Sequence, residues 1–219
     1  TKAMNLHKGM FSEVIAQPIK MPNSSITPPR ADLEKILIIR RHENECPFAF
    51  LAEKYDLRYS DPDRPIEDQI QWADMCITLG RGALESMAYG RPVIVADNRD
   101  YMGAIGDGYV DADNVDELAR CNFSGRRYKI PITPEWVTEQ VAKYNCDDSS
   151  FLIKYVMDNH NAPKIAAQYL KFGAITETET VKGLISIIIP VWNRHEISIE
   201  CVQAVMETTE EYEIIIVDN

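Results

Sequence analysis

The sequence of 219 residues lacks the features that mark several classes of protein. Its five cysteines are widely spaced without a C-x-x-C pair, and its four histidines are scattered. A disulfide scaffold and a zinc site are therefore poorly supported, and a reducing cytosol fits best. No apolar run approaches the roughly 20 residues that cross a bilayer.

Positive charge is also scarce. There are 23 Lys and Arg residues against 34 Asp and Glu residues, which gives a net charge of −11. This balance argues against broad binding to nucleic acid or to anionic membranes, because both need clustered Lys and Arg. An anionic ligand would have to bind through local dipoles and a few arginines. The length suits one good core, or one domain with part of another.

A glycine turn inside residues 73–97, ADMCITLGRGALESMAYGRPVIVAD, organises the rest of the chain. The apolar run Met75–Leu79 predicts a strand, which is stopped by Gly80-Arg81-Gly82. Ala83–Tyr89 then predicts a helix, and the run Val93–Asp97 predicts a second strand with its closing residue. Strand, turn, helix and strand in so short a stretch indicate a βαβ unit.

This turn is the strongest candidate for a ligand site. Unpaired N–H groups and the dipole at a helix start favour a phosphate group. Arg81 adds a fixed cation whose planar guanidinium suits paired phosphate oxygens.

The pattern along the chain predicts an α/β fold, with a doubly wound Rossmann-like parallel sheet, a helical tail and a truncated βαβ unit at the C-terminus. The expected parts are an interdomain linker at 1–30, a Rossmann-like domain at 31–174, a linker at 175–184 and the start of another domain at 185–219. We expect helices around 2–14, 47–55, 65–72, 83–89, 114–120, 135–144, 149–159, 162–172 and 193–206. Strands are expected at 35–39, 57–60, 75–79, 93–96, 185–190 and 212–217, and loops at 98–109 and 121–131.

The run GRGALESMAYGRPVIVAD resembles the nucleotide-sugar signature in the C-terminal half of GT-B glycosyltransferases, in particular the retaining family-4 enzymes. The resemblance extends less tightly over Ala31–Phe172, and PIKMPN resembles the crossing between the two Rossmann domains of that fold. It implies that a nucleotide-diphosphate sugar binds between two such domains. The sugar then passes to a glycan or another acceptor with retention of configuration and without a metal.

The resemblance also implies roles for single residues. Glu85 would hold the ribose hydroxyls, the backbone of residues 80–83 would cradle the diphosphate, and Arg41 would neutralise its charge. The alternative for Glu85 is a glutamate favoured by the helix dipole alone. The loop 122–128 could bring Arg126 or Arg127 to the ligand, or could be a solvated loop paired with nearby acids. The candidate nucleotide-sugar-binding residues are Arg41, Gly80, Arg81, Gly82, Ala83, Glu85 and Arg126, and the catalytic residues stay unassigned.

Two departures from the family pattern concern charge. The family has a second glutamate eight positions before Glu85, where this chain has Ile77, and residues 42–47 lack the lysine expected after the strand-one arginine. Either Arg81 and Arg40 compensate for these missing groups, or the donor-binding site is weakened or non-catalytic. Nucleotide binding is therefore a stronger prediction than sugar transfer.

Two aspartate pairs have the letters of a metal-binding D-x-D, namely Asp61-Pro62-Asp63 and Asp111-Ala112-Asp113. Both fall in turns, where aspartate is common because it bonds to nearby backbone. We expect no metal site in this module. His42 lies near the end of the first strand and could approach a sugar, but a lone loop histidine is more simply an exposed residue.

The last segment carries a separate resemblance. ISIIIPVWNRHE followed by EYEIIIVDN resembles the opening of family-2 GT-A glycosyltransferases, which places Pro190, Trp192, Asn193 and Asp218 around the nucleotide base. A divalent metal would belong to the part of that module beyond Asn219. The alternative is an extra βαβ unit that extends the first sheet.

The sequence therefore predicts a fragment of a two-module glycosyltransferase of polysaccharide assembly. Its partners would be the donor, a glycan or other acceptor, an N-terminal Rossmann domain and, through an exposed strand edge, a second copy of the chain. A cytoplasmic place is expected, including a peripheral one at the inner face of the membrane. The alternatives are a GT-B-type nucleotide-sugar epimerase and a non-catalytic interaction module. A Rossmann dehydrogenase is disfavoured because no G-x-G-x-x-G follows the first strand.

Overall fold

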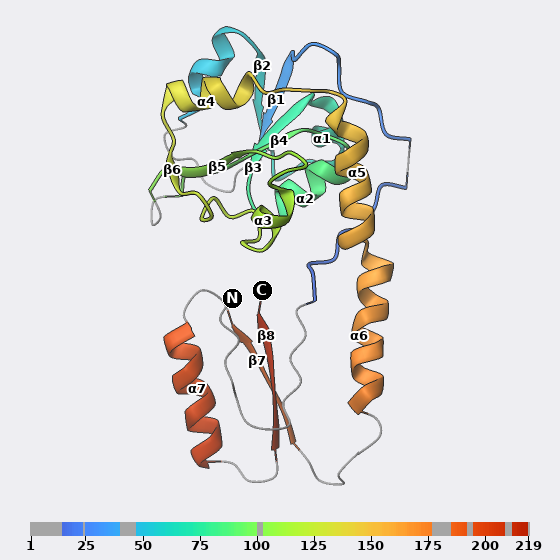
Figure 1. Cartoon of the computed structure of the whole chain (residues 1–219), viewed down its shortest axis with the longest axis vertical. Helices are drawn as coiled ribbons and strands as arrows, with labels where there is room; N and C mark the ends of the chain where they lie inside the picture. The colour runs from blue at the N-terminus through green and yellow to red at the C-terminus, as the bar shows by residue number, and fades with distance from the viewer. Residues whose placement is uncertain are drawn as a thin grey trace. The chain divides into compact units, whose positions relative to one another are not determined.

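The computed structural model describes residues 15–23, 25–39, 47–99, 103–176, 185–191, 195–208 and 212–218. These belong to two compact units, Pro18–Ile165 and a unit made of Ala166–Asn219 with Thr1–Gln17 (Figure 1). Each unit is described by itself. The helix predicted around residues 2–14 lies outside the described residues.

The first unit is built on a six-stranded sheet with the order β2-β1-β3-β4-β5-β6. The first four strands in sequence pair in parallel, which confirms the predicted Rossmann-like α/β architecture. The strands are β1 (Lys35–Ile38), β2 (Asp56–Tyr59), β3 (Met75–Thr78), β4 (Val93–Asp97), β5 (Ile105–Tyr109) and β6 (Ile130–Pro131).

Helices cover both faces of this sheet, which explains why its central strands are continuously apolar. One face packs against α1 (Ile66–Trp72), α2 (Arg81–Ala88), α3 (Val115–Ala119) and α5 (Asp148–Asn159). The other face packs against the 3₁₀ helix η1 (Ala49–Glu53) and α4 (Pro134–Val141). Helix α6 (Ala162–Thr176) follows α5.

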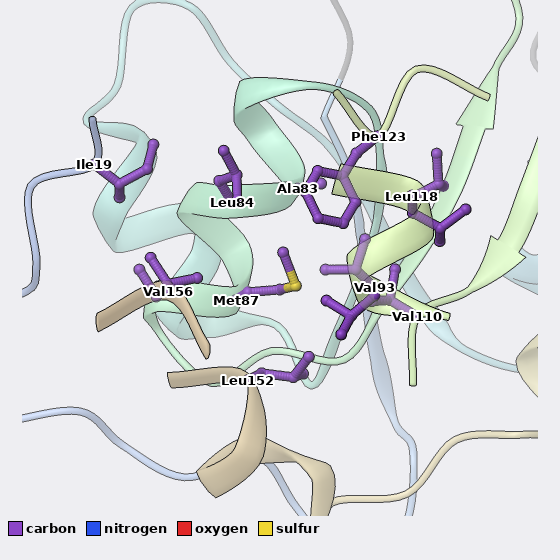
Figure 2. Packing of buried hydrophobic residues seen from close by; sticks show 13 residues of the cluster. Ile19, Ala83, Leu84, Met87, Val93, Val110, Leu118, Phe123, Leu152 and Val156 are labelled. Carbon is purple, nitrogen blue, oxygen red and sulfur yellow. The ribbon is translucent and has the colours of Figure 1, made fainter. Parts of the chain in front are cut away.

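Helix α2 is held by the packing that Figure 2 shows. Its Leu84 and Met87 are fully buried and belong to one cluster with Leu152 and Val156 of α5. Burial of such side chains contributes about 1.5–3 kcal/mol each. The packing of α2 in the core thereby fixes the position of the turn at its N-terminus.

The structure corrects the loop that we predicted at 98–109. Part of it is β5, which pairs antiparallel to β4, so the sheet is not parallel throughout. Gly106 and Gly108 look like loop residues in the sequence, but their lack of a side chain allows α4 to pack closely against β5. A Cβ on Gly106 would lie 2.4 Å from the ring of Trp136, and one on Gly108 would lie 2.6 Å from Gln140 Oε1.

Smaller corrections concern element type and extent. The helix predicted at 47–55 is a short 3₁₀ helix, and the loop predicted at 121–131 ends in the two-residue strand β6. Helix α6 continues to Thr176, past the expected end of the helical tail.

Residues 18–23, predicted to be linker, pack onto the first unit. Ile19 is 1% exposed and belongs to the core cluster behind α2 (Figure 2). Its N–H donates to the carbonyl of His160 at 2.7 Å, and its own carbonyl accepts from Ala162 N–H at 2.9 Å. This short segment is therefore part of the structure that surrounds α2.

The second unit contains β7 (Ile185–Val191), α7 (His195–Thr208) and β8 (Tyr212–Asp218). The strands pair in parallel with Ile188 opposite Ile215, so the predicted βαβ pattern is confirmed. The two strands form a sheet of their own and do not extend the six-stranded sheet. Among the described residues, every helix is too short or too polar to cross a membrane.

Two glycines with similar φ angles give a matched test of the packing of α5 against the end of α2. Gly90 has φ +67°, and a Cβ there would lie 2.2 Å from Ser149 Oγ and 3.0 Å from Ile153 Cδ1. Gly103 has φ +70°, but a Cβ there would meet no heavy atom of the described residues within 4 Å. We expect Gly90→Ala to lower the free energy of unfolding by about 3 kcal/mol, because backbone strain and overpacking add.

Gly103→Ala should lower the free energy of unfolding by only about 1 kcal/mol, since this substitution strains the backbone but causes no overpacking. Urea unfolding followed by tryptophan fluorescence measures both values. Equal losses in the two variants would contradict the close packing of α5 on the end of α2.

Candidate functional site

The N-terminus of α2 lies at the carboxyl edge of the sheet, where its winding reverses. From β1 the chain first moves outward to β2, and then crosses back to place β3 on the other side of β1. The residues after β1 and β3 therefore flank a topological switch point. Open α/β sheets bind their ligands at such points.

The turn between β3 and α2 depends on Gly80. This residue has φ +56° and ψ −128°, a conformation that a side chain strongly disfavours. Its N–H donates to the carbonyl of Phe123 at 2.8 Å, and its own carbonyl accepts from Ala83 N–H at 3.1 Å. The amides of Gly80 and Ala83 are thus already used within the chain.

Gly82 brings the start of α2 against the sheet. A Cβ at this position would lie 2.4 Å from Thr78 Oγ1 and 3.6 Å from Ile39 Cγ2, at the ends of β3 and β1. The N–H groups of Gly82 and Arg81 find no acceptor among the residues that the structure describes. Of the predicted diphosphate cradle, these two amides are the ones open to an anion.

Arg81 and Glu85 form an ion pair one turn apart on α2. Arg81 Nε donates to Glu85 Oε1 at 2.7 Å, and the two side chains are 56% and 26% exposed. The sequence prediction gave these residues separate ligand roles, but here they face one another. No described residue pairs with the guanidinium NH₂ groups or with Glu85 Oε2, so these atoms can meet a ligand.

The pair lies on the wall of a groove of about 420 Å³ that runs along α2. Helix α1 forms a second wall and residues 19–23 form a third. Sequence reasoning missed this third wall, because a proline-containing run with one isoleucine carries no periodic signal. At the far end is Tyr89, whose pKa is raised by burial and further by the carboxylates of Glu67, Asp68 and Glu85.

The loop 121–128 lies against the same turn through the bond between Gly80 and Phe123. Arg126 in this loop is half-buried and does not line the groove, so its predicted role at the ligand stays a prediction. Arg127 instead pairs with Glu117 of α3, which also accepts a hydrogen bond from the Tyr128 hydroxyl at 2.7 Å. For Arg127 the solvated, acid-paired alternative is the observed one.

Ile77 is 1% exposed and lies between Ile38 and Ile94 in the centre of the sheet. The position where the resembling family has a glutamate is thus inside β3. An acid there would be buried in the core and not presented to a ligand.

The remaining predicted residues fall in three groups. Ala83 is fully buried and contributes packing. Pro190 and Asp218 lie near the carboxyl ends of the paired strands β7 and β8, so the structure brings their backbones close together. The candidates outside the described residues are Arg40, Arg41, His42, Trp192 and Asn193.

The two D-x-D sequences form turns. Asp61 Oδ1 accepts from the N–H of Asp63 at 2.9 Å, and Asp111 Oδ1 accepts from the N–H of Asp113 at 3.0 Å. No group of three or more His, Cys, Asp and Glu side chains arranged to hold a metal occurs in the described part of the chain.

The loop that carries Arg126 should loosen in acid. The hydrogen bond from Tyr128 and then the bonds from Arg127 lower the pKa of Glu117 below its ordinary value of 4.5. Because the folded pKa is depressed, this stabilisation is complete above pH 4.5 and is lost as the pH falls through the lowered value.

We therefore expect hydrogen-exchange protection in residues 126–130, corrected for intrinsic rates, to fall below pH 4.5. Glu117→Gln should lower this protection already at pH 7 and flatten its pH dependence. An unchanged pH profile in the variant would show that Glu117 does not anchor the loop.

In comparisons with known proteins, no family model matches this sequence, and no curated protein or solved structure matches it either.

Proposed function

We propose that the first unit is the donor-binding half of a glycosyltransferase. It would bind a nucleotide-diphosphate sugar at the start of α2, and the sugar would pass to a glycan or other acceptor. The observation that carries this proposal is the glycine turn. It sets two open amides beside an arginine–glutamate pair, at the switch point of a Rossmann-like sheet.

The two ends of the Arg81–Glu85 pair suit two parts of such a ligand. The amides of Arg81 and Gly82, the helix dipole and the guanidinium favour the diphosphate. Glu85 Oε2 can accept from a ribose hydroxyl while Oε1 stays with Arg81. Donors aimed at a departing diphosphate stabilise the charge that develops on it, so this module would need no metal.

The second unit supports the proposal through its pattern alone. A strand, a helix and a parallel strand with Pro190 and Asp218 near the strand ends fit the opening of a GT-A module. We propose that the two modules act in one protein, with the acceptor side of the first supplied by a further Rossmann domain. The assignment to polysaccharide assembly in the cytoplasm is part of this proposal.

One observation favours a second candidate, a non-catalytic module that positions an active partner. Ile77 is buried inside β3, so the sheet has no room for the second acid at the equivalent position. Such a module would keep nucleotide binding without turnover. Transfer assays on the full-length protein with Glu85→Ala separate the two candidates, since only an active first module loses its product.

Nucleotide binding is the direct test. We expect UDP, GDP or ADP to bind weakly in calorimetry, and Glu85→Ala and Arg81→Ala to weaken binding about tenfold or more. This follows because hydrogen bonds to charged groups contribute about 1.5–3 kcal/mol.

Helix α5 offers a matched control. Lys154 and Asp158 form another ion pair one turn apart, away from the groove, so Asp158→Ala should bind like the parent. The site assignment fails if no nucleotide binds, or if the Glu85 and Arg81 variants bind as well as Asp158→Ala.

A further inference from the structure

The groove along α2 continues past the residues that the proposed donor site uses. From Glu85 it extends to Tyr89 at the end of the helix, nearly two turns away from the open amides. Its volume of about 420 Å³ is in the range of small-molecule sites. A diphosphate at the start of α2 would leave this part of the groove empty.

The lining of this part suits a flat, partly polar ring. The floor is apolar, with Ile70 and Ala88 fully buried and Ile19 almost so. Tyr89 adds a half-buried aromatic ring. The opposite wall is the irregular segment 20–23. The backbone C=O groups of this segment, and its N–H groups other than at Pro22, which has none, are engaged by none of the described residues. Free peptide groups beside an apolar floor can bond the edge of a ring that lies on the floor.

Charge gives the groove a direction. Its Tyr89 end lies among carboxylates. Burial is the main reason that the pKa of Tyr89 is raised, and the nearby carboxylates of Glu67, Asp68 and Glu85 raise it further. The other end of the groove has Arg81, whose guanidinium pairs with Glu85. Lys20 also lines the groove, on the wall formed by residues 19–23. The carboxylates favour hydroxyl and amino donors at the Tyr89 end, whereas the Arg81 guanidinium favours a phosphate at the start of α2.

We propose that the groove between α1, α2 and residues 19–23 is a nucleoside subsite, with the ribose at Glu85 and the base between Tyr89 and the backbone of residues 20–23. This assignment rests on the proposed function, and it adds the place of the base and the wall that holds it. The wall is anchored, because Ile19 bonds at both its N–H and its carbonyl to residues at the junction of α5 and α6.

Two ligands separate the subsite from the phosphate site, namely a nucleoside diphosphate and inorganic pyrophosphate. We expect Tyr89→Ser to weaken the binding of the tightest of UDP, GDP and ADP about tenfold, since stacking on an aromatic ring is lost. Pyrophosphate should bind this variant like the parent. Tyr169→Ser in α6 is the control, because Tyr169 is 52% exposed and does not line the groove.

Photolabelling of the parent chain tests the same assignment without a substitution. A nucleoside diphosphate with an azide on its base should label residues 20–23 or Tyr89, as peptide mass spectrometry would show. If nucleotide binds but the label lies elsewhere, or Tyr89→Ser binds nucleotide like Tyr169→Ser, the subsite is wrong while the donor site stands. If neither nucleotide nor pyrophosphate binds the parent, both assignments fall together.

Discussion

The close approach of α2 to the sheet is the constraint on which the candidate site depends. It requires a bare Cα at position 82, because Thr78 Oγ1 occupies the space of a side chain. It also requires the backbone angles of Gly80, which turn the chain from β3 into α2 without an intervening loop. The helix start is therefore held at the carboxyl edge of the sheet, and its first two amides find no acceptor among the described residues. Binding of an anion there would need little rearrangement of the backbone.

The same turn ties together segments that are distant in sequence. The N–H of Gly80 is not available to a ligand, because it donates to the carbonyl of Phe123. This hydrogen bond also fixes the loop that carries Arg126 against the turn. Ile19 and Met87 share one core cluster, so the segment that forms one wall of the groove is packed against α2, the helix that forms another. A rigid core on one side and an irregular backbone on the other is an arrangement common to binding sites.

Much of this was predictable from the sequence, for identifiable reasons. The runs at β1, β3 and β4 are continuously apolar, and a sheet covered on both faces requires that. The glycine turn and α2 follow from residues 80–90 alone. Strand β5 was missed because Gly106 and Gly108 are there to admit Trp136 and Gln140 of α4, a tertiary reason that no local pattern shows. The groove wall at residues 19–23 was missed for the same reason, since its order comes from a distant helix junction.

Ile77 shows how the backbone limits what the site can do. Because β3 runs directly into the turn, the position eight residues before Glu85 lies in the sheet and is flanked by Ile38 and Ile94. A carboxylate there would lose its hydration without gaining a partner, so an apolar residue is what the strand requires. To present an acid at the edge, the chain would need extra residues between β3 and α2, and these would move the helix start away from Thr78. Close seating of α2 and a second acid at this position are thus incompatible, which is why donor binding is a firmer proposal for this unit than sugar transfer.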